Sequence, residues 1–509
     1  MVGAGPGAPG LITVRGLECL RSTDVVLYDH LCNPFLLREA PSHAKLIFAG
    51  KHAGARSLTQ KRIEALMLHH ARKGRKIVRL KGGDPFLFGR GAEEAQYLRK
   101  HKIMFEIVPG VTSAIAVPAY AGIPVTHRHY ASGVAMITAQ ENLNKSQEAL
   151  DYPSLAKFPG SLVVLMAVKS LEEVSQKLLA AGKPPVTPAA VICSGTRGFQ
   201  QTIVSRLDNI VERARKVGLH PPAVAVIGDV VKCRQQLKWF EHRPLFGKRI
   251  VVTRTREQAS EVSSQLWELG AEVLELPTIE IQRVHSAEVH QVVRRVSEWD
   301  WIVFTSPWAV DFFLESVLEE RGDLRVLWKA RFAVVGPTTA SKLQARGLRW
   351  DFMPKVHTAE ALATEIKKRI PKIQNLTFKG QPWKVLLPRS EIGGNIIEKA
   401  FREIGATVHA VTIYRNIQPK LTWEIEALER IGVDMVTFTS SSTSENFVRL
   451  LKSRNALSVS AKKMLRTAKF ISIGPSTSAT LRRLGLQVHA EARTSTIQGL
   501  IRCLKSLAN

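Results

Sequence analysis

The chain has 509 residues, of which 45% are hydrophobic and 23% charged, and this composition excludes a disordered or fibrous protein and a single small module. Its 72 Lys and Arg against 44 Asp and Glu give a formal net charge of +28, spread over both halves of the chain. Such a charge is typical of a protein whose partner is nucleic acid or a small polycarboxylate, although a solvated basic surface would also produce it.

The sequence shows no sign of export or membrane insertion. Its longest apolar runs, such as 162–168, are far shorter than the ~20 residues that span a bilayer. No signal peptide is visible, and the five cysteines are scattered without a C-x-x-C pair. We therefore expect a cytoplasmic protein with no disulfide framework, no metal site and no membrane contact.

The first half alternates short β-rich runs with helical patterns, which predicts an α/β fold with ligands at the carboxyl ends of the strands. A helix is expected between Thr59 and Gly74, because Ile63, Leu66, Met67, His70 and Ala71 would share one face. The expected strands are 25–28, 76–80, 105–108, 134–138, 162–166, 189–192 and 224–227.

The chain opens with Gly3-Ala4-Gly5-Pro6-Gly7-Ala8, which fits the G-x-G-x-x-[GA] pattern of dinucleotide-binding loops. Asp24 or Asp29 would then contact a ribose, and the protein would be a nicotinamide-dependent oxidoreductase. However, only Met1 and Val2 precede the loop, and Pro6 lacks the N–H that a phosphate needs. Close approach to another ligand, or a plain glycine turn, also fits the pattern.

Three further segments of the first half have residues suited to ligand binding. Gly82 and Gly83 follow the strand at 76–80 and would let a ligand lie against the backbone, while Asp84 could accept hydrogen bonds. Arg90 and Glu93, three residues apart near a helix start, could grip a carboxylate or form only a surface ion pair. Thr112 and Ser113 stand where a helix cap is expected, a position that also permits ligand contact.

The second half repeats itself. Residues 248–254 resemble 384–389, residues 300–306 recur as 434–440, and residues 335–340 recur as 473–478, in the same order and at nearly constant spacing. This repeat predicts two similar α/β domains that face each other across a ligand cleft.

Long motifs of the first half, Val2-Gly-Ala-Gly-Pro-Gly7, Arg79-Leu-Lys-Gly-Gly-Asp-Pro-Phe86 and Pro109-Gly-Val-Thr-Ser113 among them, resemble uroporphyrinogen-III C-methyltransferase over about residues 1–240. Residues 245–509 resemble uroporphyrinogen-III synthase through shorter signatures. The resemblance implies a two-domain tetrapyrrole-methylase-type fold at 1–240, a linker at 241–247 and a synthase at 248–509. The synthase would have two α/β lobes separated by a cleft, a middle lobe of about 282–417 and another formed by 248–281 with 418–509.

By this resemblance the chain is a bifunctional enzyme that closes hydroxymethylbilane to uroporphyrinogen III and methylates it at C2 and C7 to precorrin-2. S-adenosylmethionine would be the methyl donor, with no metal and no nucleic acid, and the methyltransferase half would form a homodimer. Asp29 and Lys51 match the family's proton acceptor and donor, although the residue types leave Asp29 and Arg90 both open as the base. Arg90 and Glu93 match a pair beside the porphyrinogen. The residues that would line the S-adenosylmethionine site are Pro6, Gly82, Gly83, Asp84, Leu87, Thr112, Ser113, Met166 and Gly195.

In the synthase half, Tyr414 matches a tyrosine that assists departure of the substrate hydroxyl. The residues matched to loops that hold substrate carboxylates are Thr305, Ser306, Gly336, Thr338, Thr439, Ser440, Ser441, Gly474 and Ser476, and each hydroxyl could equally serve as a helix cap. Three departures from the family pattern are visible, of which Ala92 in place of a common glycine is minor. The strand before Val2 is short, as if the start were truncated, and Thr138-Ala139-Gln140 replaces a common Thr-Gly-His.

Overall fold

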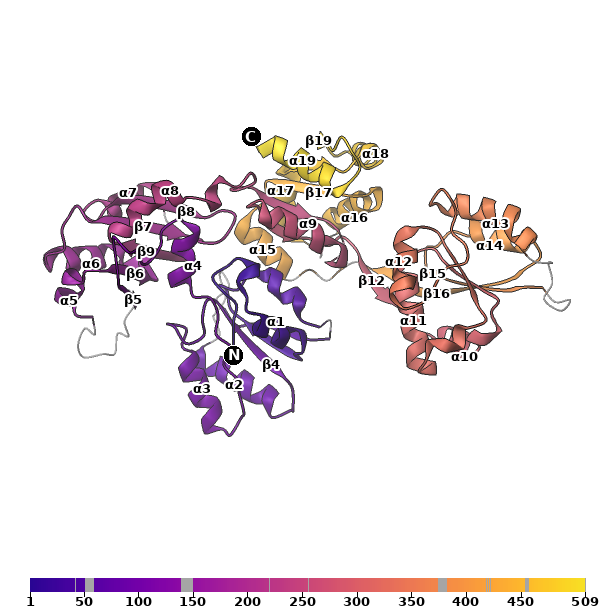
Figure 1. Cartoon of the computed structure of the whole chain (residues 1–509), viewed down its shortest axis with the longest axis horizontal. Helices are drawn as coiled ribbons and strands as arrows, with labels where there is room; N and C mark the ends of the chain where they lie inside the picture. The colour runs from indigo at the N-terminus through magenta and orange to yellow at the C-terminus, as the bar shows by residue number, and fades with distance from the viewer. Residues whose placement is uncertain are drawn as a thin grey trace. The chain divides into compact units, whose positions relative to one another are not determined.

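The computed structural model describes residues 1–41, 43–50, 59–138, 150–218, 220–254, 256–373, 382–417, 419, 421, 423–453 and 457–508. They form two compact units, which we call unit 1 (Met1–Thr278 with Lys420–Asn509) and unit 2 (Ile279–Pro419), both of mixed α/β structure (Figure 1). Within these ranges no helix has the length and apolarity needed to cross a membrane.

Unit 1 begins with a parallel four-stranded sheet in the order β1-β4-β2-β3, which contains the glycine-rich strand ends. Alternate residues of one strand serve opposite faces. Val25 and Leu27 pack with Ile63 of the predicted helix, whereas Val26 lies in a different cluster with Leu20. The elements are β1 (Val2–Gly3), β2 (Val25–Tyr28), β3 (Lys45–Phe48), β4 (Ile77–Lys81), α1 (Val14–Arg21), α2 (Gln60–Ala71) and α3 (Gly91–Lys100).

The strand predicted at 105–108 is wrong. This segment runs beside β1, where Val108 accepts a hydrogen bond from Gly3 (3.0 Å) and donates one to Met1 (2.9 Å). Since β1 has only two residues, the pairing ends after a single bridge between Val2 and Val108. The short partner, and not the sequence of 105–108, prevents a strand from forming.

A second sheet of unit 1 is mixed and five-stranded, in the order β5-β6-β9-β7-β8. Four of its strands, β5, β6, β7 and β9, coincide within a residue or two with predicted strands, and β8 was not predicted. In the first sheet, β1 and β3 were not predicted. Helices α5, α6 and α7 cover one face, and α4 lies on the other. The elements are β5 (Val134–Thr138), β6 (Ser161–Leu165), β7 (Pro188–Cys193), β8 (Gln201–Arg206), β9 (Ala223–Ile227), α4 (Ser113–Tyr120), α5 (Tyr152–Lys157), α6 (Ala167–Ala180) and α7 (Ile210–Val217).

The sequence repeat is a repeat of structure. The third sheet of unit 1 has the order β11-β10-β17-β18-β19, and the sheet of unit 2 has the order β12-β16-β15-β13-β14. The matching segments occupy matching places, because β11-β10-β17-β18 corresponds strand by strand to β16-β15-β13-β14. The strands are β10 (Arg249–Val252), β11 (Glu272–Glu275), β12 (Glu280–Arg283), β13 (Trp301–Phe304), β14 (Arg331–Val334), β15 (Lys384–Ser390), β16 (Thr407–Ile417), β17 (Met435–Phe438), β18 (Lys469–Ser472) and β19 (Ala490–Glu491).

Helices cover both faces of the unit 2 sheet, as Figure 1 shows. Ile302 and Phe304 pack with one set of helices, and Trp301 and Val303 pack with the other. Both faces are therefore buried, as expected for a parallel sheet. The first set is α10 (Ala287–Arg294), α11 (Pro307–Arg321) and α12 (Pro337–Ala345), and the second is α13 (Ala359–Ile373) and α14 (Ile396–Glu403).

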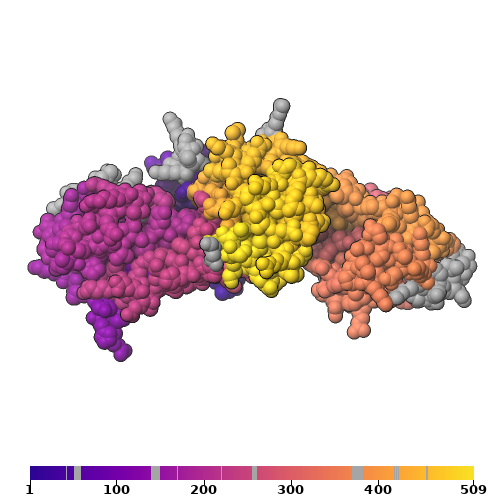
Figure 2. All heavy atoms as spheres, turned by 90° about the horizontal axis from the view of Figure 1, so that it is seen from above, coloured from indigo at the N-terminus to yellow at the C-terminus, as the bar shows by residue number. Residues whose placement is uncertain are grey.

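Unit 1 is held together by a hydrophobic cluster that draws on distant parts of the chain. Leu36 and Leu37 lie between β2 and β3, in the 3₁₀ helix Pro34–Glu39, and share this cluster with Trp423 and Leu428 of α15 (Trp423–Ile431). The segment predicted as a linker is also packed, since Leu245 is fully buried in a cluster with Leu504 of α19 (Ile497–Ala508). In Figure 2 the surface of the C-terminal residues, in yellow, continues without a break into that of the magenta residues near 240.

Candidate active sites

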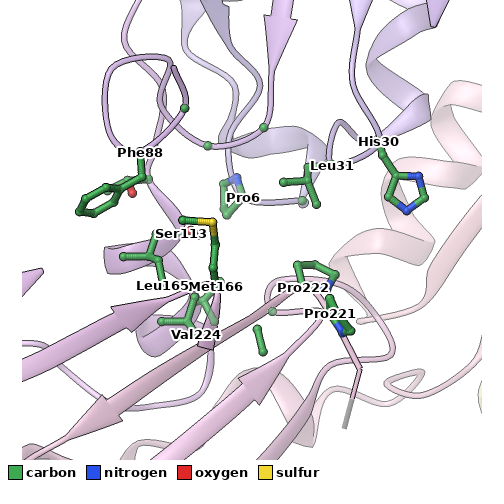
Figure 3. A pocket seen from close by; sticks show the side chains of 18 of the residues that line it. Pro6, His30, Leu31, Phe88, Ser113, Leu165, Met166, Pro221, Pro222 and Val224 are labelled. Atoms are coloured by element: carbon green, nitrogen blue, oxygen red, sulfur yellow. The ribbon is translucent and has the colours of Figure 1, made fainter. Parts of the chain in front are cut away.

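A cavity of about 660 Å³ in unit 1 is lined by the loops that leave the carboxyl ends of β1, β2, β4, β6 and β7. Figure 3 shows Pro6, Leu31, Ser113 and Met166 around this cavity, which we call the strand-end pocket. The structure brings together there all the residues predicted to contact the methyl donor, namely Pro6, Gly82, Gly83, Asp84, Leu87, Thr112, Ser113, Met166 and Gly195.

Glycines in and beside the loops of the strand-end pocket allow backbones to pack directly on one another. A Cβ added to Gly3 would lie 2.4 Å from the Cα of Gly110, and one added to Gly110 would lie 2.2 Å from the carbonyl oxygen of Gly83. Gly83 also has a φ of +69°, which side chains rarely adopt. These contacts require glycine before any ligand is considered.

The same contacts argue against the dinucleotide interpretation. The amide of Ala4 donates to Lys81, that of Gly5 donates to Gly83, and that of Ala8 donates to the Thr196 hydroxyl. The next α-helix, α1, begins only at Val14. The amides of Ala4, Gly5 and Ala8 are therefore already hydrogen-bonded, and only a short 3₁₀ helix, Pro9–Leu11, directly follows the loop.

Asp84 shapes the strand-end pocket through its carboxylate. One oxygen accepts hydrogen bonds from the amides of Phe86 (2.8 Å) and Leu87 (3.1 Å), and the other accepts one from Gly110 (2.9 Å). Thr112 caps α4 by accepting a hydrogen bond from the amide of Ala114 (3.2 Å). Both side chains fix the loops that line the cavity.

Asp29 stands at the end of β2 with its carboxylate on the pocket wall, 23% exposed. It accepts hydrogen bonds from the amides of Leu31 (3.1 Å) and Gly82 (3.4 Å), and Arg79 lies 3.8 Å away. The carboxylate is thus oriented by the backbone and still reaches the cavity, a geometry suited to accepting a proton.

A buried charge cluster that was not predicted from the sequence lies next to Asp29. Glu94 is fully buried and pairs with Lys81 (3.1 Å) and Arg79 (3.5 Å), and Gln60 donates to it (3.1 Å). Burial lowers the pKa of Lys81, and the neighbouring Arg79 lowers it further, while Glu94 opposes this. The signal available for this cluster was Arg79 in the strand predicted at 76–80 and Lys81 directly after it, two charged residues at alternate positions.

Arg90 and Glu93 form the predicted ion pair, with Nε–O distances of 3.1 Å. The hydrogen bonds raise the pKa of Arg90 and lower that of Glu93. Arg90 lines the cavity, while Glu93 holds it from the outer side. The predictions for Lys51 and for the Ala139-Gln140 substitution fall outside the described residues.

Backbone strain concentrates around the strand-end pocket. Among the described residues, six non-glycine residues have a positive φ, and four of them line the cavity: Phe88, Arg90, Met166 and Ser194. Each costs about 1–3 kcal/mol and persists only where the surrounding fold imposes it, a pattern common at functional sites.

In unit 2, the Tyr414 hydroxyl lies 2.9 Å from that of Ser306. Tyr414 is buried at the end of β16, and Ser306 caps α11 by accepting a hydrogen bond from the amide of Ala309 (3.2 Å). Gly336 stands at the N-terminus of α12, with Thr338 exposed in its first turn and Thr305 half-buried beside Ser306. These side chains share the edge where β13 and β14 end.

The equivalent edge of unit 1 has the same organisation. Ser440 caps α16 (Ser441–Lys452), Gly474 precedes α18 (Pro475–Arg483), and the hydroxyls of Ser441 and Ser476 lie 3.2 Å apart. Thr439 is half-buried in the same turn. Both halves of the repeat therefore present helix N-termini and hydroxyls, which suit carboxylate groups. Across the part of the chain that the structure describes, no group of three His, Cys, Asp or Glu could hold a metal ion.

Comparison with known proteins agrees with this division. The family of tetrapyrrole (corrin/porphyrin) methylases matches residues 1–211, and that of uroporphyrinogen-III synthase HemD matches residues 260–502. The porphyrin biosynthesis protein HemD of Ruminiclostridium josui is 33% identical over 504 residues, covering 98% of this chain and 96% of that protein.

Two methyltransferases are also similar. The uroporphyrinogen-III C-methyltransferase of Bacillus subtilis is 40% identical and covers 68% of this chain and 71% of its own length. The S-adenosyl-L-methionine-dependent uroporphyrinogen III methyltransferase of Methanosarcina barkeri is 47% identical over 231 residues, 45% of this chain and 91% of that protein. The chain thus belongs to the family of proteins that join a tetrapyrrole methylase to a uroporphyrinogen-III synthase.

Proposed function

We propose that the chain closes hydroxymethylbilane to uroporphyrinogen III and methylates this product at C2 and C7 to give precorrin-2. The observation that carries the proposal is the strand-end pocket, where the residues matched to a methyl-donor site surround one cavity. A tetrapyrrole substrate is polycarboxylated, and the net charge of +28 would attract it. The cytoplasmic location and the homodimer stay predictions.

The strand-end pocket suits S-adenosylmethionine in shape and chemistry. Leu165, Met166 and Val224 offer an apolar wall for a flat ring, while the glycine backbones leave room for close approach (Figure 3). When bound, S-adenosylmethionine supplies an electrophilic methyl group. The chain's own task is then to hold the nucleophilic pyrrole carbon in line and to exclude water.

Asp29 is the group we assign as proton acceptor. Methylation of a pyrrole carbon would form a C–C bond as the C–S bond of the methyl donor breaks, and the ring system must then lose a proton, which the Asp29 carboxylate takes up. Its two backbone hydrogen bonds fix its orientation throughout. Arg90 hydrogen-bonds Glu93 through Nε and Nη2, and a guanidinium is better suited to binding a carboxylate than to accepting a proton.

For the synthase step we assign Tyr414 as proton donor. The C–O bond of the hydroxymethyl group breaks, the leaving hydroxyl takes the phenol proton and departs as water, and an azafulvene cation remains to close the ring. Ser306, 2.9 Å away, can hydrogen-bond the phenolate that forms. Helix N-termini near it would hold the substrate carboxylates.

The test is an anaerobic incubation of the purified protein with hydroxymethylbilane, with and without S-adenosylmethionine, read by mass and isomer analysis. The proposal predicts the type III isomer without the methyl donor and a dimethylated product with it. Formation of the type I isomer without methylation would refute both activities, and an unmethylated type III product would refute the methyltransferase alone.

A further inference from the structure

One residue of the strand-end pocket comes from the synthase half. Arg430 lies in the last turn of α15, more than 200 residues beyond the other residues that line the cavity, yet both belong to unit 1. Its guanidinium donates to the backbone carbonyl of His30 (3.0 Å) and lies 3.4 Å from the His30 ring nitrogen. His30 directly follows Asp29, the proposed proton acceptor.

The position of α15 is fixed by packing on both of its ends. Trp423, Leu428 and Ile431 share one buried cluster with Leu36 and Leu37, which follow the His30 loop. A helix anchored in this way holds its last turn, and hence Arg430, against the pocket wall. Arg430 is therefore a fixed part of the cavity and not a passing contact.

Arg430 differs from the other cations of the strand-end pocket in its partners. Among the described residues no carboxylate forms an ion pair with it, and its hydrogen bonds go only to His30. Arg430 is exposed at the cavity, the protein packed around it and the charge of Arg197 lower its pKa, and the carboxylates of Glu272 and Glu426 oppose this shift. The cations that do have a carboxylate partner are Arg79, Lys81, Arg90 and Arg197.

We infer that Arg430 binds a carboxylate of the tetrapyrrole substrate, so that the synthase half completes the binding site of the methyltransferase half. Only Nη1 of Arg430 hydrogen-bonds His30 among the described residues, and a guanidinium whose other N–H groups face the cavity is suited to bidentate recognition of a carboxylate. The inference rests on the proposed methyltransferase function and adds a specificity-determining residue to it. It also gives the fusion of the two halves a role in substrate binding.

The experiment compares Arg430→Gln and Arg430→Lys with wild type in the full-length protein. We expect Arg430→Gln to raise the KM for uroporphyrinogen III roughly tenfold, the loss of one charge-assisted hydrogen bond. Its kcat should stay within about twofold, and Arg430→Lys should recover part of the loss because it keeps the charge. Arg466→Gln, which removes an exposed arginine from the same half, should behave as wild type.

Two further readouts separate the possible causes. S-adenosylhomocysteine affinity, measured by calorimetry, should be unchanged in Arg430→Gln, because Arg430 is assigned to the tetrapyrrole. Synthase activity on hydroxymethylbilane reports whether the variant is folded. An unchanged KM, or a fall in kcat alone, would overturn the inference and leave Arg430 as a support for the His30 loop.

The oxidised substrate analogue uroporphyrin III gives a test that does not require turnover. Its binding, followed by fluorescence, should weaken roughly tenfold in Arg430→Gln and stay unchanged in Arg466→Gln. Equal affinity for wild type and Arg430→Gln would overturn the inference. Absence of methylation by the wild-type protein would instead refute the proposed function, so the two failures are distinguishable.

Discussion

Replacing Glu272 by Gln should destabilise unit 1 although Glu272 itself does not line the strand-end pocket. Glu272, on β11, is 1% exposed and accepts hydrogen bonds from Arg197 Nε (3.1 Å) and from the amide of Gly198 (3.1 Å). The Arg197 side chain is 11% exposed and lines the cavity. Glutamine keeps the shape but leaves the buried guanidinium without a counter-ion.

Removing one partner of a buried ion pair costs about 3–5 kcal/mol, because the remaining charge is left desolvated. We expect the lower end for Glu272→Gln, since the amide oxygen can still accept one hydrogen bond. For a unit of this size, about 3 kcal/mol lowers the midpoint of thermal unfolding by roughly 4 °C. Affinity for S-adenosylhomocysteine should fall as well, since Arg197 lies against the Gly7 loop of the cavity.

Calorimetric unfolding of the full-length protein is the assay, with Glu268→Gln as the matched control. Glu268 is an exposed residue of the neighbouring helix α9 (Arg256–Glu268), so its replacement should change stability by no more than about 0.5 kcal/mol. If Glu272→Gln unfolds at the same temperature as Glu268→Gln, the ion pair contributes nothing and the reasoning is refuted.

Three other predictions concern single groups. Tyr414→Phe should lower synthase turnover on the order of 100-fold by removing the proton donor, and Ser306→Ala should lower this turnover by a smaller factor. Equal synthase activity of Tyr414→Phe and wild type would exclude Tyr414 as the proton donor. Asp29→Asn should lower methylation by a similar factor with S-adenosylhomocysteine affinity retained, and a normal rate would return Arg90 as candidate base. Burial opposes the ionisation of Asp434, but hydrogen bonds from Arg249 outweigh it and lower the pKa. The stabilisation that the Asp434 carboxylate contributes is therefore complete above pH about 4 and is lost as the pH falls through its folded-state pKa. Wild type and Asp434→Asn should then unfold at increasingly similar temperatures as the pH is lowered. A difference in unfolding temperature that stays constant with pH would contradict this.

Much of the fold could be predicted because its signals are local. Val25–Tyr28 and Val134–Thr138 are apolar runs whose bounds agree with β2 and β5. β3 was missed since its residues are half exposed, and β8 since polar residues flank its two apolar residues, Ile203 and Val204, on both sides. The repeat predicted matching lobes, and the matching strand orders confirm their similarity.

The strand-end pocket could be predicted in part for a different reason. Its loops contain glycines that the backbone contacts require, so a motif marks them whether or not a ligand is present. The charge cluster around Glu94 carries no such mark. Glu94 meets Lys81 from a helix 13 residues away, and only the fold shows that the two side chains turn towards each other.

The contacts between the two halves lie furthest from anything a sequence pattern can show. Arg197 pairs with Glu272, and Arg38 pairs with Glu275 (2.6 Å), over separations of 75 and 237 residues. In the sequence of either half alone, each of these charged residues has no partner in view and therefore looks like an ordinary surface residue.

The Methanosarcina barkeri methyltransferase provides a comparison for the proposed role of Arg430. Its similarity covers 231 residues, which are 45% of this chain and 91% of that protein, so that protein is too short to contain a whole synthase half beside a methylase half. In the fused chain, Arg430 of the synthase half adds a contact to one carboxylate of the tetrapyrrole. If Arg430 binds that carboxylate here, the fused chain has transferred part of its substrate recognition to the neighbouring domain, and the separated halves should methylate less efficiently than the intact protein even when both are folded.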